Sequence, residues 1–139
     1  MIQELLPGAE PVGLLYYSAE ANAQYQEDPV QKYLADMGYT CTQYSFSDSN
    51  DLAAVATTAA QESDVIYVPT DNTVASNTEI IRNICEPAQV PIISGEEGIS
   101  SGRGVATLSI SYYAPGVATG NIAVPLPPGE AATSQLPIA

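Results

Sequence analysis

A short apolar segment that ends abruptly in a polar loop constrains the fold of this chain more than any other feature. Residues 65–68 read Val-Ile-Tyr-Val, a continuous run of β-branched and aromatic side chains, which predicts a strand covered on both faces. Pro69 has no N–H group to donate to a neighbouring strand, so the strand should end there. Within the polar stretch that follows, Asp71 or Asn72 can cap a helix. A buried strand followed directly by a helix predicts an α/β fold.

Further strand-like segments recur along the chain, and helical segments separate them. The sequence predicts strands at 12–17, 39–46, 65–68, 90–94 and 105–112, and helices at 1–6, 21–37, 51–62, 73–88 and 114–123. Strands that alternate with helices in this way build a parallel sheet from right-handed βαβ units. The strand at 39–46 alternates and should lie at an edge. With no internal repeat or linker, residues 1–139 are predicted to form a single domain.

Two of the predicted helices contain proline. Pro29 lies inside the segment 21–37 and should kink the helix or restart it, with Asp28 as the new cap. The apolar side chains of this segment fall roughly on one stripe, namely Tyr25, Val30, Tyr33, Leu34 and Met37. The segment 73–88 reads as one helix that ends near Pro87.

Composition excludes several classes of function. Three basic residues stand against 16 acidic ones, for a formal net charge of −13, which argues against binding nucleic acid or an anionic membrane surface. No apolar run approaches the roughly 20 residues that span a bilayer, and no secretory signal follows Met1. Cys41 and Cys85 are too few for a disulfide framework or a metal motif and are predicted to be buried thiols. The absence of histidine rules out a Ser-His-Asp triad and ordinary zinc sites.

Polar loops follow the first, third and fourth predicted strands, at residues 18–22, 70–73 and 95–97. In an open α/β sheet such loops converge at the carboxyl edge, where small ligands bind. Helix N-termini suit a carboxylate and loop carboxylates suit an ammonium group, so together the loops would fit a zwitterion such as an amino acid. The hypothesis requires that Asn22, Asp71 and Glu96 lie near one another. Its alternative is that Asn22 and its counterparts in the second loop merely cap helices.

Catalysis is not predicted. Glu96 and Glu97 are adjacent, and on extended backbone they would point to opposite sides. The serines after the fourth strand have no histidine as a base, and no dinucleotide-binding or P-loop motif occurs. The sequence therefore predicts no enzyme activity, no cofactor and no metal.

Two other interpretations concern the strand ends. A receiver-type switch domain would carry an acidic pair after the first strand and a lysine after the fifth, whereas those strands end in Tyr17-Ser18 and in Tyr112-Tyr113. That interpretation fails. The tyrosine pairs at 16–17 and 112–113 are either core-edge residues with hydroxyls in water or, for one member of each pair, stacking partners of an aromatic ligand.

Several segments resemble ABC-transporter substrate-binding proteins of the tryptophan/tyrosine-uptake type. They are residues 12–16, 18–22, 47–51, 66–76, 90–95, 112–116 and 119–120. The Tyr-Val-Pro-Thr-Asp-Asn-Thr block at 67–73 is the most specific of them. The resemblance covers nearly the whole chain.

The resemblance implies a three-layer αβα sandwich with a mostly parallel sheet of five or six strands, a Rossmann- or flavodoxin-like lobe of a type I periplasmic binding protein. Residues 1–139 would then be one lobe of a two-lobed receptor that closes on its ligand and presents it to an ABC permease. Such a parent would be extracytoplasmic, in the periplasm or anchored as a lipoprotein on the outer face of the membrane. The ligand contacts expected on this basis, together with the loop residue Glu96, are Ser18, Glu20, Asn22, Thr70, Asp71 and Asn72.

The chain departs from the family pattern at two places. Residues 95–98 read Gly-Glu-Glu-Gly where the family has an Asp-rich loop, and Ser111 stands where Ile-Asp-Tyr-Tyr would carry aspartate. We predict an amino acid or a similar small zwitterion as the ligand, with an aromatic side chain as one option. The alternative is a stand-alone α/β domain that binds a small molecule or a protein partner unrelated to transport.

Overall fold

The computed structural model describes residues 1–101, 106–107, 109 and 113–123. The chain divides into two units, Met1–Ser109 and Ile110–Ala139. The first is an α/β domain, and the described part of the second is the helix α7 (Tyr113–Ala123), which was predicted at 114–123. No helix in the described ranges combines the length and apolar character needed to cross a membrane.

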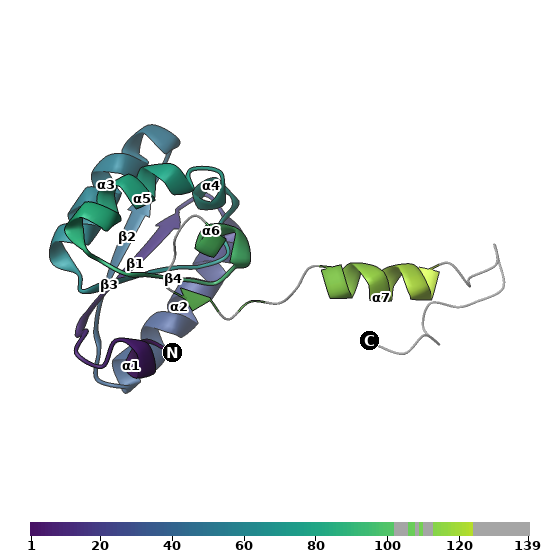
Figure 1. The fold of residues 1–139 in the computed structure, drawn as a ribbon, viewed down its shortest axis with the longest axis horizontal. Coiled ribbons are helices and arrows are strands. Elements are labelled where there is room, and N and C mark those ends of the chain that lie inside the picture. The colour runs from purple at the N-terminus through teal and green to yellow at the C-terminus, as the bar shows by residue number, and fades with distance from the viewer. Residues whose placement is uncertain (102–105, 108, 110–112, 124–139) are drawn as a thin grey trace. The chain divides into compact units, whose positions relative to one another are not determined.

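A parallel sheet forms the centre of the first unit (Figure 1). Its strands are β1 (Pro11–Tyr17), β2 (Thr40–Phe46), β3 (Val65–Val68), β4 (Ile92–Ser94) and β5 (Ala106–Thr107). They are ordered β2-β1-β3-β4-β5, and every described pairing is parallel. The predicted parallel sheet and the edge position of β2 are thereby confirmed. Most of the fifth strand predicted at 105–112 lies outside the described residues.

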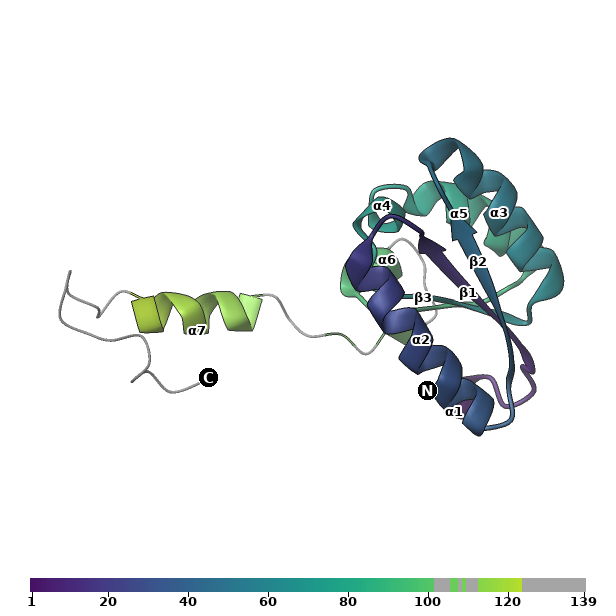
Figure 2. The same cartoon turned by 180° about the vertical axis from the view of Figure 1, so that it is seen from behind.

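Helices cover both faces of this sheet, as the two opposite views show (Figure 2). On one face lie α1 (Ile2–Leu5) and α2 (Ala21–Asp36), and on the other α3 (Ser49–Glu62) and α5 (Thr78–Ala88). Two shorter helices, α4 (Asn72–Ala75) and α6 (Glu97–Ser101), follow β3 and β4. The first unit is therefore a three-layer αβα sandwich, as predicted.

The central strand β3 contributes to both halves of the core. Val65 packs with the α1 and α2 side, whereas Ile66 and Val68 pack with the α3 and α5 side. All three side chains are fully buried. This alternation explains why the segment carries no polar residue, since both of its faces are covered by helices.

The structure corrects the predictions for the segment 21–37. The helix α2 continues through Pro29, so the restart at Asp28 was wrong. Both Pro29 and Tyr25 are exposed, which leaves the unpaired carbonyl of Tyr25 able to reach water. Four members of the predicted apolar stripe do share one side of α2 and line a common hollow, namely Val30, Tyr33, Leu34 and Met37, but only Leu34 among them is buried. Tyr25 and Tyr33 keep 81% and 68% of their surface exposed.

The single helix predicted at 73–88 is divided into α4 and α5. Asn77 adopts a non-helical conformation between them, and its side chain donates a hydrogen bond of 2.8 Å to the carbonyl of Thr73. Ser76 donates similarly to the carbonyl of Asn72. Such side-chain bonds compete with the backbone pattern of a continuous helix. The end of α5 follows prediction, with Pro87 in its last turn and a left-handed Gln89 after it.

Candidate ligand-binding site

The carboxyl ends of β1, β3 and β4 lead into three loops at one edge of the sheet. Figure 1 shows α4 and α6 side by side near the tip of the β1 arrow, and these two helices are in contact. Gly95 brings the third loop against the second, because a Cβ atom at this position would stand only 3.1 Å from the backbone nitrogen of Thr70. A residue with a side chain would push the two loops apart, so glycine is required by close packing here.

Asp71 ties two of these loops together. Its Oδ2 atom accepts a hydrogen bond of 2.6 Å from the backbone N–H of Tyr17, at the end of β1. Its Oδ1 atom accepts one of 2.9 Å from the N–H of Val74, so the predicted helix cap at Asp71 is confirmed. The side chain is fully buried, and burial raises its pKa against the opposing effect of these two hydrogen bonds. Both of its oxygens are thus engaged inside the protein.

Glu20 connects the first loop to the second through its carboxylate. It accepts hydrogen bonds from the backbone N–H of Asn72 at 3.1 Å and from the Asn72 side chain at 2.7 Å. The side chain of Asn22 donates to it as well, at 3.1 Å. Partial burial raises the pKa of Glu20, but the hydrogen bonds from Asn72 and Asn22 outweigh burial and lower it. This carboxylate is therefore ionised near neutral pH.

The first turns of α2 reach across to the loop after β3. The side chain of Asn22 donates a hydrogen bond of 2.9 Å to the carbonyl of Thr70, and Gln26 accepts one of 3.1 Å from the N–H of Thr70. Gln24 donates to the carbonyl of Ser18. Sequence reasoning missed Gln24 and Gln26. The spacing of four residues between Asn22 and Gln26, which places both on one helix face, was the available signal.

Glu96 and Ser18 complete the group of predicted residues. Glu96 is buried, and its pKa is raised first by burial and then by the negative charges of Asp71 and Glu20. Its neighbour Gly95 lies against Thr70, which places Glu96 next to the loop after β3. The hydroxyl of Ser18 donates a hydrogen bond of 3.0 Å to the carbonyl of Phe46. This hydroxyl therefore connects the ends of β1 and β2.

The residues predicted from the three loops therefore converge at one edge of the sheet. Within this group Asn22 and Asn72 are exposed, Ser18, Glu20 and Thr70 are partly exposed, and Asp71 and Glu96 are buried. Convergence satisfies the geometric condition that the hypothesis set. That these side chains contact a ligand stays a prediction.

The N-terminus of α2 is the other notable feature of this edge. Glu20 occupies the N-cap position, yet its side chain makes no cap hydrogen bond to its own helix. The carboxylate is turned instead toward Asn72 on the neighbouring loop. Among the residues that the structure describes, no side chain accepts a hydrogen bond from the first N–H groups of this 16-residue helix, an arrangement that favours an anion.

The tyrosines of β1 are partly buried and lie at the edge of the core. The ring of Tyr17 packs against Phe46 with a centroid distance of 5.4 Å, and the Tyr16 hydroxyl donates a 3.0 Å hydrogen bond to Gln43. Of the second predicted pair, Tyr112 lies outside the described residues and Tyr113 is exposed on α7. Stacking of either pair on a ligand stays a prediction.

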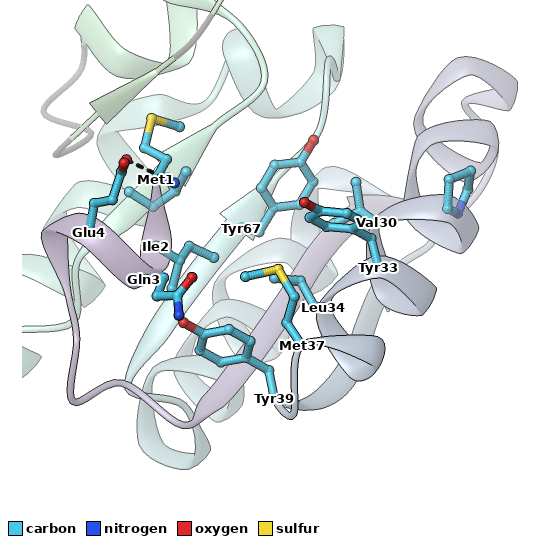
Figure 3. Close-up of a pocket in the computed structure, with 12 residues that line it drawn as sticks. Met1, Ile2, Gln3, Glu4, Val30, Tyr33, Leu34, Met37, Tyr39 and Tyr67 are labelled. Atoms are coloured by element: carbon cyan, nitrogen blue, oxygen red, sulfur yellow. Dashed lines mark ion pairs between the residues drawn. The ribbon is translucent and has the colours of Figure 1, made fainter.

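A hollow with a volume of about 690 Å³ lies away from the three loops, on the α1 and α2 side of the sheet. Figure 3 shows Tyr33 and Met37 of α2 on one side, Ile2 of α1 on the other, and Tyr67 of β3 behind them. Its lining is mainly apolar, and its one drawn ion pair joins the amino group of Met1 to Glu4 at 3.4 Å. Sequence reasoning did not predict it.

The described cysteines and carboxylates hold no metal-like arrangement. Within the described ranges, no group of three or more Cys, Asp or Glu side chains is placed to bind a metal ion. Cys85 is buried as predicted and burial raises its pKa to about 11. Cys41 is only partly buried, so the prediction of two buried thiols was half right.

Comparison with known proteins places the chain among solute receptors. A family profile described as ABC transporter substrate binding protein matches residues 1–137. A curated tyrosine-binding protein from Clostridioides difficile (strain R20291) is 28% identical over 130 residues, covering 94% of this chain and 38% of the relative.

Solved structures agree with this match. An ABC domain from Streptococcus pneumonia in complex with L-Trp has a TM-score of 0.83 and 29% identity, covering 89% of this chain and 42% of that one. An open, ligand-free substrate-binding protein with adhesive properties from Clostridium difficile has a TM-score of 0.78 and 30% identity, covering 99% and 46%. The chain therefore spans less than half the length of these relatives.

Proposed function

This chain belongs to the family of ABC transporter substrate-binding proteins, and we propose that it forms one ligand-binding lobe of such a receptor, with an amino acid as its ligand. The supporting observation is the pairing of two features at one edge of the sheet. The N-terminus of α2 lacks a side-chain cap, and the ionised carboxylate of Glu20 lies beside it. A zwitterion offers one charge to each.

The two charged ends of an amino acid have separate partners in this proposal. The carboxylate of the ligand binds the free N–H groups at the start of α2, where the helix dipole favours negative charge. The ammonium group binds Glu20, with Glu96 nearby, since cations suit carboxylates at close range. Asn22 and Asn72 are exposed at the same place and supply amide groups to either end.

Buried Asp71 has a different part in this site. Because both of its oxygens accept backbone hydrogen bonds, it positions the loops that carry Glu20 and Asn72. That Asp71 also contacts the ligand remains a proposal. Mutation of Asp71 can separate this role from its role in positioning the loops.

The similar proteins guide the choice of side chain. The pneumococcal domain was solved with L-Trp, and the clostridial relative is described as tyrosine-binding. We propose a large apolar or aromatic amino acid for this chain. Since the relatives are more than twice as long, the other half of a full-length receptor would cover the ligand by hinge closure. Presentation to an ABC permease outside the cytoplasm, without chemical change of the ligand, completes the proposal.

Calorimetric titration of the full-length protein with the standard L-amino acids tests this function. Tryptophan or tyrosine should bind, whereas N-acetyl-tryptophan and tryptophanamide, which lack the ammonium and carboxylate charges respectively, should both bind much more weakly. Equal affinity for the blocked compounds would contradict the two-ended recognition. Failure of every amino acid to bind would overturn the ligand class.

A further inference from the structure

Glu27 is a buried carboxyl group that the proposed ligand site does not use. It points inward from α2 together with Ala23 and Leu34, and only 1% of its surface is exposed. Neither carboxyl oxygen has a hydrogen-bond partner among the described residues. Buried polar groups almost always have partners, because an unpaired one costs free energy. A carboxyl group kept in this position therefore calls for a physical explanation.

The surroundings of Glu27 oppose a negative charge. Cys41 of β2 and Tyr67 of β3 pack on the same side of the sheet as α2, and the pKa of each is raised first by its own burial and then by the charge of Glu27. The charged groups that act on Glu27 are Asp28, on the same helix, and Asp71, after β3. Burial, followed by these two negative charges, raises the pKa of Glu27 to about 8. The carboxyl group is thus neutral at pH 7.

The same helix holds the ligand-site loop in place. Gln26, the residue before Glu27, accepts a hydrogen bond from the N–H of Thr70, and Asn22, one turn earlier, donates to the carbonyl of Thr70. At the N-cap, Glu20 accepts from Asn72. These contacts depend on how the first half of α2 lies against the sheet. The position of Glu27 beneath that half links its environment to the loop.

We propose that Glu27 is a proton-dependent switch, whose neutral form lets α2 pack on the sheet and hold the Thr70–Asn72 loop, and whose ionised form displaces the helix and releases that loop. An ionised carboxylate has no partner beneath the helix, so it gains stability by moving toward water. Movement of α2 stretches the hydrogen bonds of Gln26 and Asn22 to Thr70. The switch is a property of the fold and holds whether or not the site binds an amino acid.

Nuclear magnetic resonance titration of the 139-residue chain without ligand tests the switch. The Glu27 carboxyl carbon should titrate with a midpoint near 8, far above its ordinary value of 4.5. The amide signals of Thr70 and Asn72 should shift with the same midpoint. A midpoint near the ordinary value would overturn the proposal, as would titration of Glu27 without any response from Thr70 and Asn72. This measurement requires no variant and so does not depend on a mutant folding.

Two variants on the same helix sharpen the test. In Glu27→Gln, which cannot ionise, the transition of Thr70 and Asn72 near pH 8 should vanish. Asp36→Asn removes an exposed carboxylate from the last turn of α2, and the transition should persist there. Persistence in Glu27→Gln, or loss in Asp36→Asn, would refute the assignment to Glu27. Because no ligand is added, failure of the proposed amino-acid site would leave these outcomes unchanged.

Discussion

The two faces of the sheet are built on different physical principles. The face beneath α3 and α5 carries the larger apolar cluster, which includes Leu52, Ala59 and Ile81, all nearly inaccessible to water. The face beneath α1 and α2 contains the unpaired Glu27, an open hollow, and the largely exposed Tyr33 at its rim. The α3 and α5 side thus buries mainly apolar groups, whereas the α1 and α2 side also buries a carboxyl group, which costs free energy.

This difference assigns separate tasks to the two faces. Close packing of small and aliphatic side chains makes the α3 and α5 layer a rigid support, since interiors of this kind tolerate little change in volume. The helix α2 is held more by hydrogen bonds at its N-terminal end, through Glu20, Asn22 and Gln26. Substitutions on the first face should therefore alter stability, and those around α2 should alter the candidate site.

The largest effect is expected from truncation on the packed face. Leu52→Ala removes a fully buried side chain of α3 and should lower the free energy of unfolding by about 3 kcal/mol. The matched change Val30→Ala, at the rim of the open hollow, should lower it by less than about 1 kcal/mol, because Val30 is only partly buried. Urea denaturation measures both. Equal losses would show that the two faces are packed alike.

The next effect concerns the junction between the loops. Asp71→Ala leaves the N–H groups of Tyr17 and Val74 without their acceptor and should lower the free energy of unfolding by about 2 kcal/mol. It should also abolish most of the thermal shift that an amino acid produces. Asp71→Asn, which keeps one carbonyl oxygen as a cap, should recover part of the stability. Full retention of the ligand shift in Asp71→Ala would reduce this residue to a helix cap.

A third, pH-dependent effect separates Glu27 from the packed face. Its pKa is raised from 4.5 to about 8 in the folded state, so between these values the folded state binds a proton that the unfolded state has released. The free energy of unfolding should therefore be highest below pH 4.5. It should fall as the pH rises toward 8, by up to about 1.4 kcal/mol per pH unit if no other group titrates. In Glu27→Gln this slope, measured by urea denaturation between pH 5 and pH 8, should be much smaller, leaving only the part due to Asp71 and Glu96, whose pKa values are also raised. If the free energy of unfolding changed with pH in the same way in the unmodified chain and in Glu27→Gln, the assignment to Glu27 would be contradicted.

Local chemistry explains which parts of the fold could be predicted from sequence. The run at 65–68, its stop at Pro69 and the cap at Asp71 depend on neighbouring residues, and all three hold in the structure. The convergence of the loops followed from the general topology of parallel sheets. Membership of the receptor family, predicted from the block at 67–73, is confirmed by the family match.

Tertiary contacts explain what could not be predicted. Glu27 lies between Gln26 and Asp28 in a polar stretch, and nothing local distinguishes it from an exposed glutamate. Its burial depends on where α2 lies on the sheet, as does the exposure of Tyr33. The division at Asn77 of the helix predicted at 73–88 depends on a side-chain hydrogen bond that composition does not reveal.

The smallest effect on stability, and the most selective for the site, is expected at Glu20. Because this carboxylate is only partly buried, Glu20→Gln should change the free energy of unfolding by less than about 1 kcal/mol. It should weaken binding of an amino acid about tenfold, a loss of about 1.4 kcal/mol, since an ionised partner of the ammonium group becomes neutral. Glu79→Gln, an exposed change on α5, should leave binding unaltered. Calorimetric titration of both variants measures whether ligand charge is recognised at the edge near α2 and not at the α3 and α5 layer. Equal affinities of Glu20→Gln and Glu79→Gln for the amino acid would contradict this difference between the two regions.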